Sequence, residues 1–300
     1  MNNDTKKLLS ILNIITAVLL LAVTVCGVLS FSTAHTFETV NQYGDTVKMW
    51  GYGIYKHDSF FKAPLYIGTD LTILALVLPL SAAAFVKARR QPSLENHIEC
   101  FGNLAILLYY AASLSFSITY NKLHLVYIAL FSVCLFSLCM LMGKFHTAAA
   151  SQQKVCTFKV TKGIKVFLIL SGISLFVAWL PDIITSLAKG RSLELIEVYT
   201  TEVTYVLDMG IISPIMFIAF FLVRKGSFIG YVLLRMILKV GKYLGIILPV
   251  QTVFQLLAGI ELPVPALITK VGIFVALAAF AAYFERKIKK DTQYISQPRV

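Results

Sequence analysis

The chain alternates between apolar runs of about twenty residues and short polar stretches rich in Lys and Arg. Eight such runs lie at residues 8–30, 67–86, 100–118, 123–142, 164–184, 204–223, 244–259 and 264–284. A transmembrane α-helix needs roughly 20 mostly apolar residues, because it rises by about 1.5 Å per residue through a hydrocarbon core of about 30 Å. The pattern therefore predicts an all-α fold, a polytopic membrane bundle of eight transmembrane helices that forms a single integral membrane domain over residues 1–300.

Two longer polar segments separate these runs, at residues 31–66 and 185–203. The first has β-rich stretches on either side of residues 41–45, which predicts a short β-hairpin that turns at Gly44. The second carries several glutamates and is expected to form a short helix. Pro181 comes just before it and is expected to end or kink the fifth transmembrane helix.

The Lys and Arg residues fix the expected orientation in the membrane. Residues 144–165 carry lysines and no acidic residue, and most of the 27 Lys and Arg residues lie on the same side of the predicted topology. The positive-inside rule then places both termini in the cytoplasm and makes 31–66 and 185–203 external loops. The first run follows Lys6 and Lys7 and exceeds the roughly 7–15 apolar residues of a signal peptide, so we expect an uncleaved signal anchor.

Composition agrees with the membrane class. The chain is 58% hydrophobic and 14% charged, against roughly 45–50% and about 25% in average soluble domains. A net charge of +12 in a soluble protein would suggest nucleic-acid binding. Here the basic residues flank apolar runs, so the expected partner is the lipid bilayer and not nucleic acid. The five cysteines include no CxxC pair and none lies in an external loop, so neither disulfides nor a zinc site are expected.

Motifs for catalysis and cofactors are absent from the sequence. It contains no GxxxxGK[ST], GxGxxG, HExxH or GxSxG, so we predict no catalytic residue, no metal and no cofactor, and an enzyme is the less expected class. His57, Asp58 and Ser59 are residue types found in catalytic triads, but consecutive side chains cannot converge as a proton relay requires. We expect Asp58 or Ser59 to cap a short amphipathic helix instead.

The sixth run points to a polar site within the membrane. It carries Asp208 near its outer end, then Gly210 and Pro214, three features that a lipid-facing helix has little reason to keep. On the predicted topology Lys270 lies roughly 10 Å below the outer edge, where a lone lysine costs about 2.5–3.5 kcal/mol. We therefore hypothesise an outward-facing polar cavity, with Asp208 as the partner of Lys270. The expected lining residues are Asp70, Asp208, Lys270, Gln251 and Gln255.

An alternative needs no cavity. Lys270 would snorkel to the outer headgroups, and the aspartates would simply begin or end helices.

Elsewhere, Arg235, Lys239 and Lys242 share one helical face, which predicts an amphipathic cytoplasmic-side segment. That segment is expected to continue into the seventh helix near Leu244, with a bend at a nearby glycine.

Several segments resemble an uncharacterised family of bacterial multi-pass membrane proteins of similar length. They are GYGIYKHDSFFKAPLYIGTD at 51–70, TYNKLHLVYIALFSVCLFSL at 119–138, and VTYVLDMGIISPIMFIAFFLVRK at 203–225 with the GYVLL that follows. The resemblance implies a bacterial cytoplasmic membrane as the location and brings no functional residues. Two functions remain open: a small-solute or ion transporter that uses the cavity, and a non-catalytic accessory or sensor protein whose external loops meet a partner membrane protein.

Overall fold

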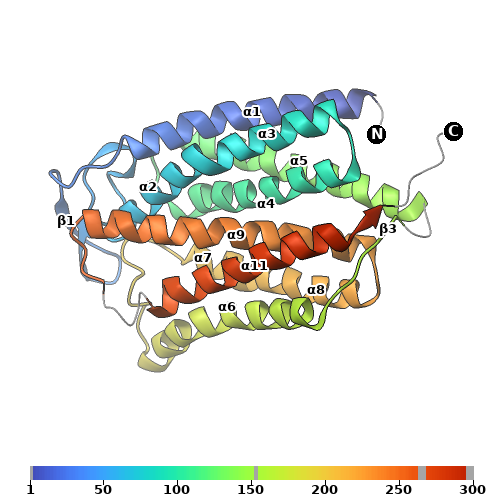
Figure 1. Cartoon of the computed structure of the whole chain (residues 1–300). Helices are drawn as coiled ribbons and strands as arrows, with labels where there is room; N and C mark the ends of the chain where they lie inside the picture. The colour runs from blue at the N-terminus through green and yellow to red at the C-terminus, as the bar shows by residue number, and fades with distance from the viewer. Residues whose placement is uncertain (1–2, 152–154, 263–267, 295–300) are drawn as a thin grey trace.

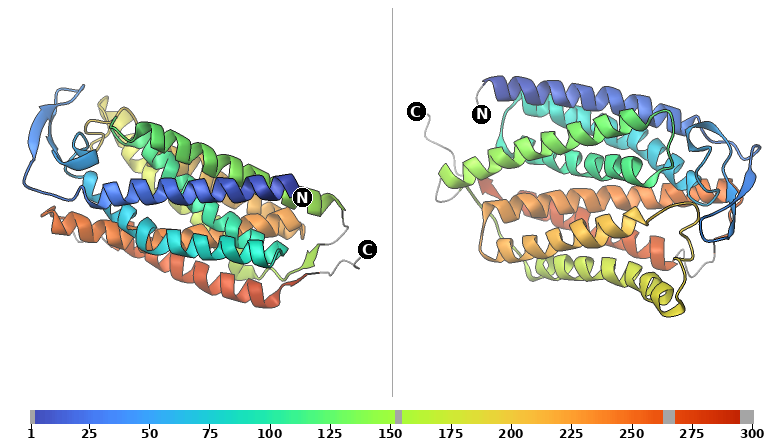
Figure 2. Two further views of the ribbon diagram at one scale, coloured as in Figure 1. Left: turned by 90° about the horizontal axis from the view of Figure 1, so that it is seen from above. Right: turned by 180° about the vertical axis from the view of Figure 1, so that it is seen from behind.

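The computed structural model describes residues 3–151, 155–262 and 268–294. Its helices lie side by side along one direction, with α1 and α6 on opposite sides and α9 between them (Figures 1 and 2). The principal helices are α1 Asn3–Val28, α2 Ala63–Thr72, α3 Leu78–Arg90, α4 Leu94–Ser117, α5 His124–Ser151, α6 Lys162–Lys189, α7 Val203–Leu207, α8 Ser213–Arg224, α9 Phe228–Leu257 and α11 Ile273–Asp291. The start of α1 and the end of α11 lie at the same end of the bundle.

Six of the described helical segments are long and apolar enough to cross a membrane, judged by length and composition. They are Asp4–Val28, Ala63–Arg90, Leu94–Ser117, His124–Ala150, Lys162–Lys189 and Val203–Arg224. They coincide with the first six predicted runs, and their number is that of a multi-pass membrane protein. The last two predicted runs lie on α9 and α11, which pack along the same bundle, although 263–267 are outside the described residues.

Two of these segments contain a π-helical turn just before a proline. The turns are Ile73–Val77 (η2), which precedes Pro79, and Asp208–Ile212 (η3), which precedes Pro214. Proline lacks an N–H group and its ring clashes with the carbonyl one turn earlier, and a wider turn relieves both problems. As a result there are two continuous helical rods, one made of α2, η2 and α3 and the other of α7, η3 and α8. In each rod the π-helical turn interrupts the α-helical hydrogen bonds.

Helix α9 is the central packing element. It is one uninterrupted helix of 30 residues and packs against α2, α4, α8 and α11. There is no break near Leu244. Instead Gly245 lets α11 pack close to α9, since a Cβ atom placed on Gly245 would lie 2.0 Å from the Cβ of Ala278. Gly245 thus serves helix packing, as small residues do between membrane helices.

The opposite end of the bundle from the termini carries a folded cap, by which we mean residues 31–62 and 190–202. Its strands β1 Phe37–Val40 and β2 Thr46–Met49 pair in antiparallel fashion, and the turn between them places Gly44 at φ 87°. Trp50 is fully buried and its indole N–H donates to the Ser30 carbonyl at 2.7 Å. A second short pairing, β3 Cys156–Thr157 with β4 Gln293–Tyr294, lies at the other end.

The expected helix in 185–203 is wrong. Helix α6 continues through Pro181 to Lys189 and ends at Gly190 in the left-handed region, and 190–202 form turns with no helix. The reason is tertiary: the Asn41 and Gln42 side chains donate to the carbonyls of Glu197 and Tyr199 at 2.8 and 2.9 Å. Those carbonyls would otherwise take part in local helical bonds.

Candidate functional site

Asp70 lies where four elements meet and is fully buried. Its two carboxylate oxygens accept hydrogen bonds from the hydroxyls of Tyr55 and Tyr110, each at 2.5 Å. On the side of α1 it rests against Gly27, where an added Cβ would lie 1.7 Å from Asp70 Oδ2. A buried carboxylate needs such partners, and here they join α1, the cap, α2 and α4.

Asp208 opens the π-helical turn η3 and is 6% exposed. Its Oδ1 accepts from the Tyr109 hydroxyl and its Oδ2 from the Trp179 indole N–H, both at 2.9 Å. No local sequence signal points to this contact, because Trp179 and Asp208 lie on different helices. The backbone of Lys270 lies in the π-helical turn Ile268–Gly272 (η4), but its side chain is outside the described residues, so the pairing with Asp208 stays a prediction.

The two predicted glutamines join α9 to α2 and to the end of the cap that precedes α2. Gln251 Nε2 donates to Thr69 Oγ1 at 2.7 Å, and Gln255 Nε2 donates to the Phe61 carbonyl at 3.1 Å. The close approach depends on Gly68, whose added Cβ would meet the Gln251 backbone at 2.8 Å. Asp70, Gln251 and Gln255 are thus engaged with protein partners across the α1–α2–α4–α9 region, whereas Asp208 lies with α4 and α6.

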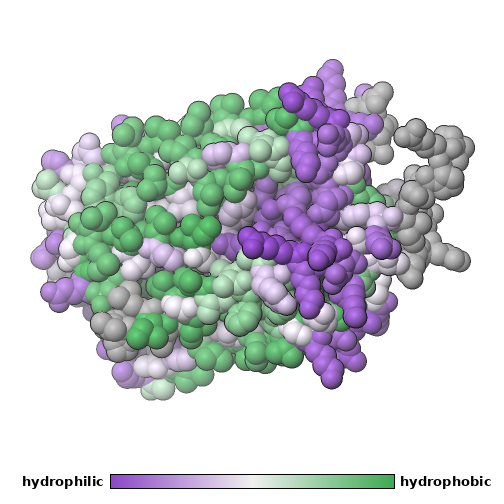
Figure 3. All heavy atoms as spheres, in the orientation of Figure 1, coloured by the Kyte–Doolittle hydropathy of each residue, from purple (hydrophilic) through white to green (hydrophobic). Residues whose placement is uncertain are grey.

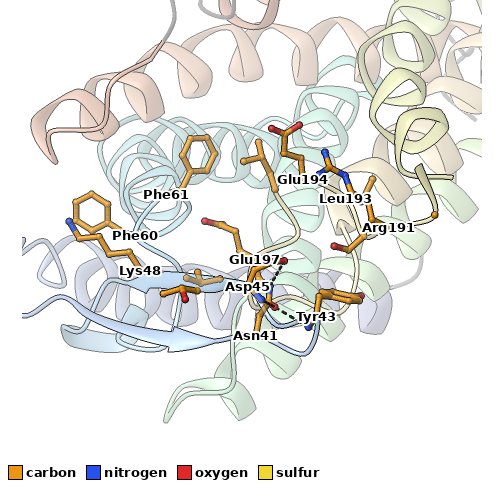
Figure 4. A pocket seen from close by; sticks show the side chains of 15 residues that line it. Asn41, Tyr43, Asp45, Lys48, Phe60, Phe61, Arg191, Leu193, Glu194 and Glu197 are labelled. Atoms are coloured by element: carbon orange, nitrogen blue, oxygen red, sulfur yellow. Dashed lines mark hydrogen bonds between the residues drawn. The ribbon is translucent and has the colours of Figure 1, made fainter. Parts of the chain in front are cut away.

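The described surface hollows lie elsewhere, in and beside the cap (Figure 4). A groove of about 730 Å³ runs between the hairpin and the 190–197 segment. Its charged lining residues are Asp45, Lys48, Arg191, Glu194 and Glu197. A smaller hollow of about 290 Å³ adjoins it and shares Arg191 to Leu195.

Opposite charges face this groove without pairing to one another. Lys48 Nζ lies 3.9 Å from the centre of the Phe60 ring, a cation–π contact. Glu197 accepts a short hydrogen bond from Ser59 Oγ, and burial raises the pKa of its carboxyl group. Neither charge has an ion-pair partner among the described residues. The groove therefore offers both a cation and a carboxylate to whatever occupies it.

The two segments of the cap, 31–62 and 190–202, are joined by two adjacent contacts. Besides the Ser59–Glu197 bond, Lys62 Nζ forms an ion pair with Glu202 Oε2 at 2.5 Å and lies 4.2 Å from the Tyr199 ring centre. Both Lys62 and Glu202 stand immediately before helices, α2 and α7. The groove wall is in this way connected directly to the two interrupted rods.

Of Asp58 and Ser59, the two residues expected to cap a helix, only Ser59 makes a hydrogen bond of that kind. Ser59 Oγ accepts from the Lys62 N–H at 3.1 Å, as expected for a residue that precedes a helix. Asp58 caps nothing; it is fully buried, and its Oδ1 accepts from the Thr119 N–H and the Tyr199 hydroxyl, both at 3.0 Å. These partners lie far away in the chain, so no local signal could have revealed them.

Arg235, Lys239 and Lys242 share one face of α9, as predicted, but this face packs against carboxylates of α4 and α11 and is not simply the polar face of an amphipathic segment. Arg235 is 2% exposed and binds Glu95 in bidentate fashion at 2.8 and 2.9 Å. It also contacts Glu99, which pairs with Lys239 at 2.5 Å. Glu285, Lys242 and Lys289 complete this network between α4, α9 and α11. In Figure 3, hydrophilic side chains gather at the end of the bundle where α11 finishes.

Within the described ranges, no group of three or more His, Cys, Asp or Glu side chains is placed to hold a metal ion. The described cysteines are all free thiols. Comparison with known proteins identifies no relative: no protein-family model, no curated protein and no solved structure matches this chain. Function therefore has to be argued from the geometry alone.

Proposed function

We propose that the protein is an external-ligand sensor or accessory protein of the bacterial cytoplasmic membrane, with eight transmembrane helices, cytoplasmic termini and an external cap that binds the ligand. The observation that carries this proposal is the groove of about 730 Å³ in the cap. Its two walls are joined by the Ser59–Glu197 and Lys62–Glu202 contacts, and Lys62 and Glu202 stand immediately before α2 and α7. An occupant of the groove thereby acts on both interrupted rods.

The groove favours a small ligand that carries both charges. Lys48 and Arg191 suit a carboxylate, while Asp45, Glu194 and Glu197 suit an ammonium group. Tyr43, Phe60 and Phe61 add aromatic surface for the apolar part of such a ligand. A free amino acid or a dipeptide has this chemistry.

Thermal unfolding of the purified protein in nanodiscs tests the proposal. Amino acids and dipeptides should raise Tm, whereas the matching amines and carboxylic acids, each with one charge, should not. Lys48→Met should abolish the rise. Lys56→Met is the matched control, because Lys56 is an exposed lysine of the cap outside the groove lining. Stabilisation that survives Lys48→Met, or stabilisation by none of the compounds, would contradict the proposal.

The orientation has its own test in a cysteine-free background. Tyr43→Cys lies on the exposed hairpin and Arg89→Cys lies at the exposed end of α3. A membrane-impermeant maleimide added to intact cells should label the first and reach the second only after permeabilisation. The reverse pattern would place the cap in the cytoplasm.

Transport of a small solute or ion is the second candidate. The observation in its favour is that Asp70 and Asp208 are buried carboxylates at or beside π-helical turns, which are frequent at functional sites. Flux into proteoliposomes that is lost in Asp208→Asn and kept in Lys48→Met would favour transport. The opposite result would favour the sensor.

A further inference from the structure

Asp58 is a fully buried carboxylate at the junction of three separate segments. Its Oδ1 joins residues 50–62 to the turn between α4 and α5 through Thr119, and to the 190–202 loop through Tyr199. Its own backbone is fixed as well, because the Asp58 carbonyl accepts from the Trp50 N–H at 2.9 Å. A change in the charge of this carboxyl group therefore affects both segments of the cap and the turn between α4 and α5.

One half of the Asp58 carboxyl group is left without a partner. Oδ2 makes no hydrogen bond within the described structure; the Thr119 hydroxyl lies near enough to lower the pKa of the Asp58 carboxyl group but does not have hydrogen-bond geometry. Nor does any basic side chain of the described ranges form an ion pair with Asp58; Lys62, whose charge acts on it, is held by Glu202 at 2.5 Å. An ionised carboxylate in such a place carries a large desolvation cost, and a protonated one does not.

Among the described residues, Asp58 is surrounded by three phenols and one ammonium group, and Glu197 of the 190–202 loop is bonded to the neighbouring Ser59. Tyr66 faces it from α2, Tyr127 from α5 and Tyr199 from the 190–202 loop, and phenols have ordinary pKa values of about 10. Lys62 is the facing cation. Burial raises the pKa of Asp58 to about 7, and the hydrogen bonds from Thr119 and Tyr199 oppose the rise.

We propose that Asp58 is a proton-binding site that holds the cap closed, so that external pH regulates access to the groove. This regulation rests on the proposed function of the groove, although the closing of the cap itself does not. Loss of the proton leaves a buried charge with one unpartnered oxygen, and the 50–62 segment opens to hydrate it. Opening releases Tyr199, and with it the loop that carries Glu197, a wall of the groove.

The direction in which pH changes the closing of the cap follows from proton linkage. The closed cap holds the proton up to about pH 7, whereas an open, hydrated Asp58 releases it near its ordinary pKa of about 3.9. The closed state thus binds more protons between these values, and closure weakens as pH rises through that window by up to about tenfold per pH unit. Above about pH 7 the closing of the cap no longer changes with pH, because Asp58 is then ionised in both the closed and the open state.

Hydrogen exchange of the full-length protein in nanodiscs, without ligand and corrected for intrinsic rates, tests this proposal. Protection of the Thr119 amide and of 190–202 should fall by several-fold or more between pH 5 and pH 7 and then level off. Asp58→Asn, which is neutral at every pH, should give protection that does not vary. Glu38→Gln changes an exposed hairpin carboxylate outside the groove and should behave as the wild type.

A second variant covers the case in which Asp58→Asn does not fold. Tyr199→Phe removes one hydrogen bond to Oδ1 that favours the ionised form, so the midpoint of the pH profile should move upward. Wild-type protection that is constant with pH, a pH profile retained in Asp58→Asn, or an unmoved midpoint in Tyr199→Phe would each overturn the proposal. Because no ligand is present, a failure of ligand binding in the groove leaves this result unaffected.

Discussion

Tyr109 and Tyr110 are adjacent residues on α4, and their hydroxyls donate to two different buried aspartates, Asp208 at 2.9 Å and Asp70 at 2.5 Å. Consecutive residues of a helix point about 100° apart, so the pair reaches two neighbours on different sides of α4. Those neighbours are the two rods with π-helical turns. Helix α4 is therefore the link between them.

Tyr110→Phe and Tyr109→Phe should each lower stability, because each leaves a buried carboxylate oxygen without its donor. The expected loss is about 1–3 kcal/mol, with Tyr110→Phe the larger because Asp70 is completely buried. The measurement is the Tm of the purified protein in detergent. Tyr120→Phe is the control, since Tyr120 is 79% exposed; equal effects in all three would show that the aspartate contacts contribute nothing.

Arg235→Met should be strongly destabilising. It would leave Glu95, Glu99 and Glu285 together without their central cation, and breaking one partner of a buried ion pair costs roughly 3–5 kcal/mol. Fluorescence-detected size exclusion of a fusion protein would show loss of the monodisperse peak. Arg89→Met removes an exposed arginine at the same end of the bundle and should leave that peak intact.

Gly245→Ala and Gly241→Ala should have opposite effects although they lie one turn apart on α9. An added Cβ at Gly245 would lie 2.0 Å from the Ala278 Cβ, so α11 must shift, whereas at Gly241 the nearest atom is Ala281 Cβ at 3.6 Å. Gly241→Ala also gains up to about 1 kcal/mol of helix propensity. We expect a lower Tm for Gly245→Ala and an unchanged or higher Tm for Gly241→Ala; the reverse order would refute the packing of α9 on α11.

The predicted Asp208–Lys270 pair needs a double-mutant cycle. Exchanging the two charges is a poor test, because a lysine at 208 would face the donors of Tyr109 and Trp179. Asp208→Asn and Lys270→Met should instead be measured singly and together. Paired groups should show a coupling beyond about 0.5 kcal/mol, whereas additivity within that limit means that the two residues are independent.

The sequence by itself determined the class of protein. Apolar runs of bilayer length are a local property of the chain, so the first six predicted runs coincide with six membrane-compatible helices. The hairpin around Gly44 was predictable for the same reason, because a turn residue and its β-rich flanks are neighbours in sequence. Asp70, Asp208, Gln251 and Gln255 all form hydrogen bonds with other residues of the protein, and their predicted role as ligand-binding residues of a cavity stays a prediction.

Only the tertiary structure decided which partners those side chains have. Asp70 meets Tyr55 and Tyr110, and Asp58 meets Tyr199 across more than a hundred residues of chain. Periodicity states which face of a helix is polar but not which neighbour it meets, so it placed Arg235 on a basic face without revealing that this side chain is buried among carboxylates. The helix expected in 185–203 failed on the same physical ground, since hydrogen bonds from Asn41 and Gln42 outweigh a weak local propensity.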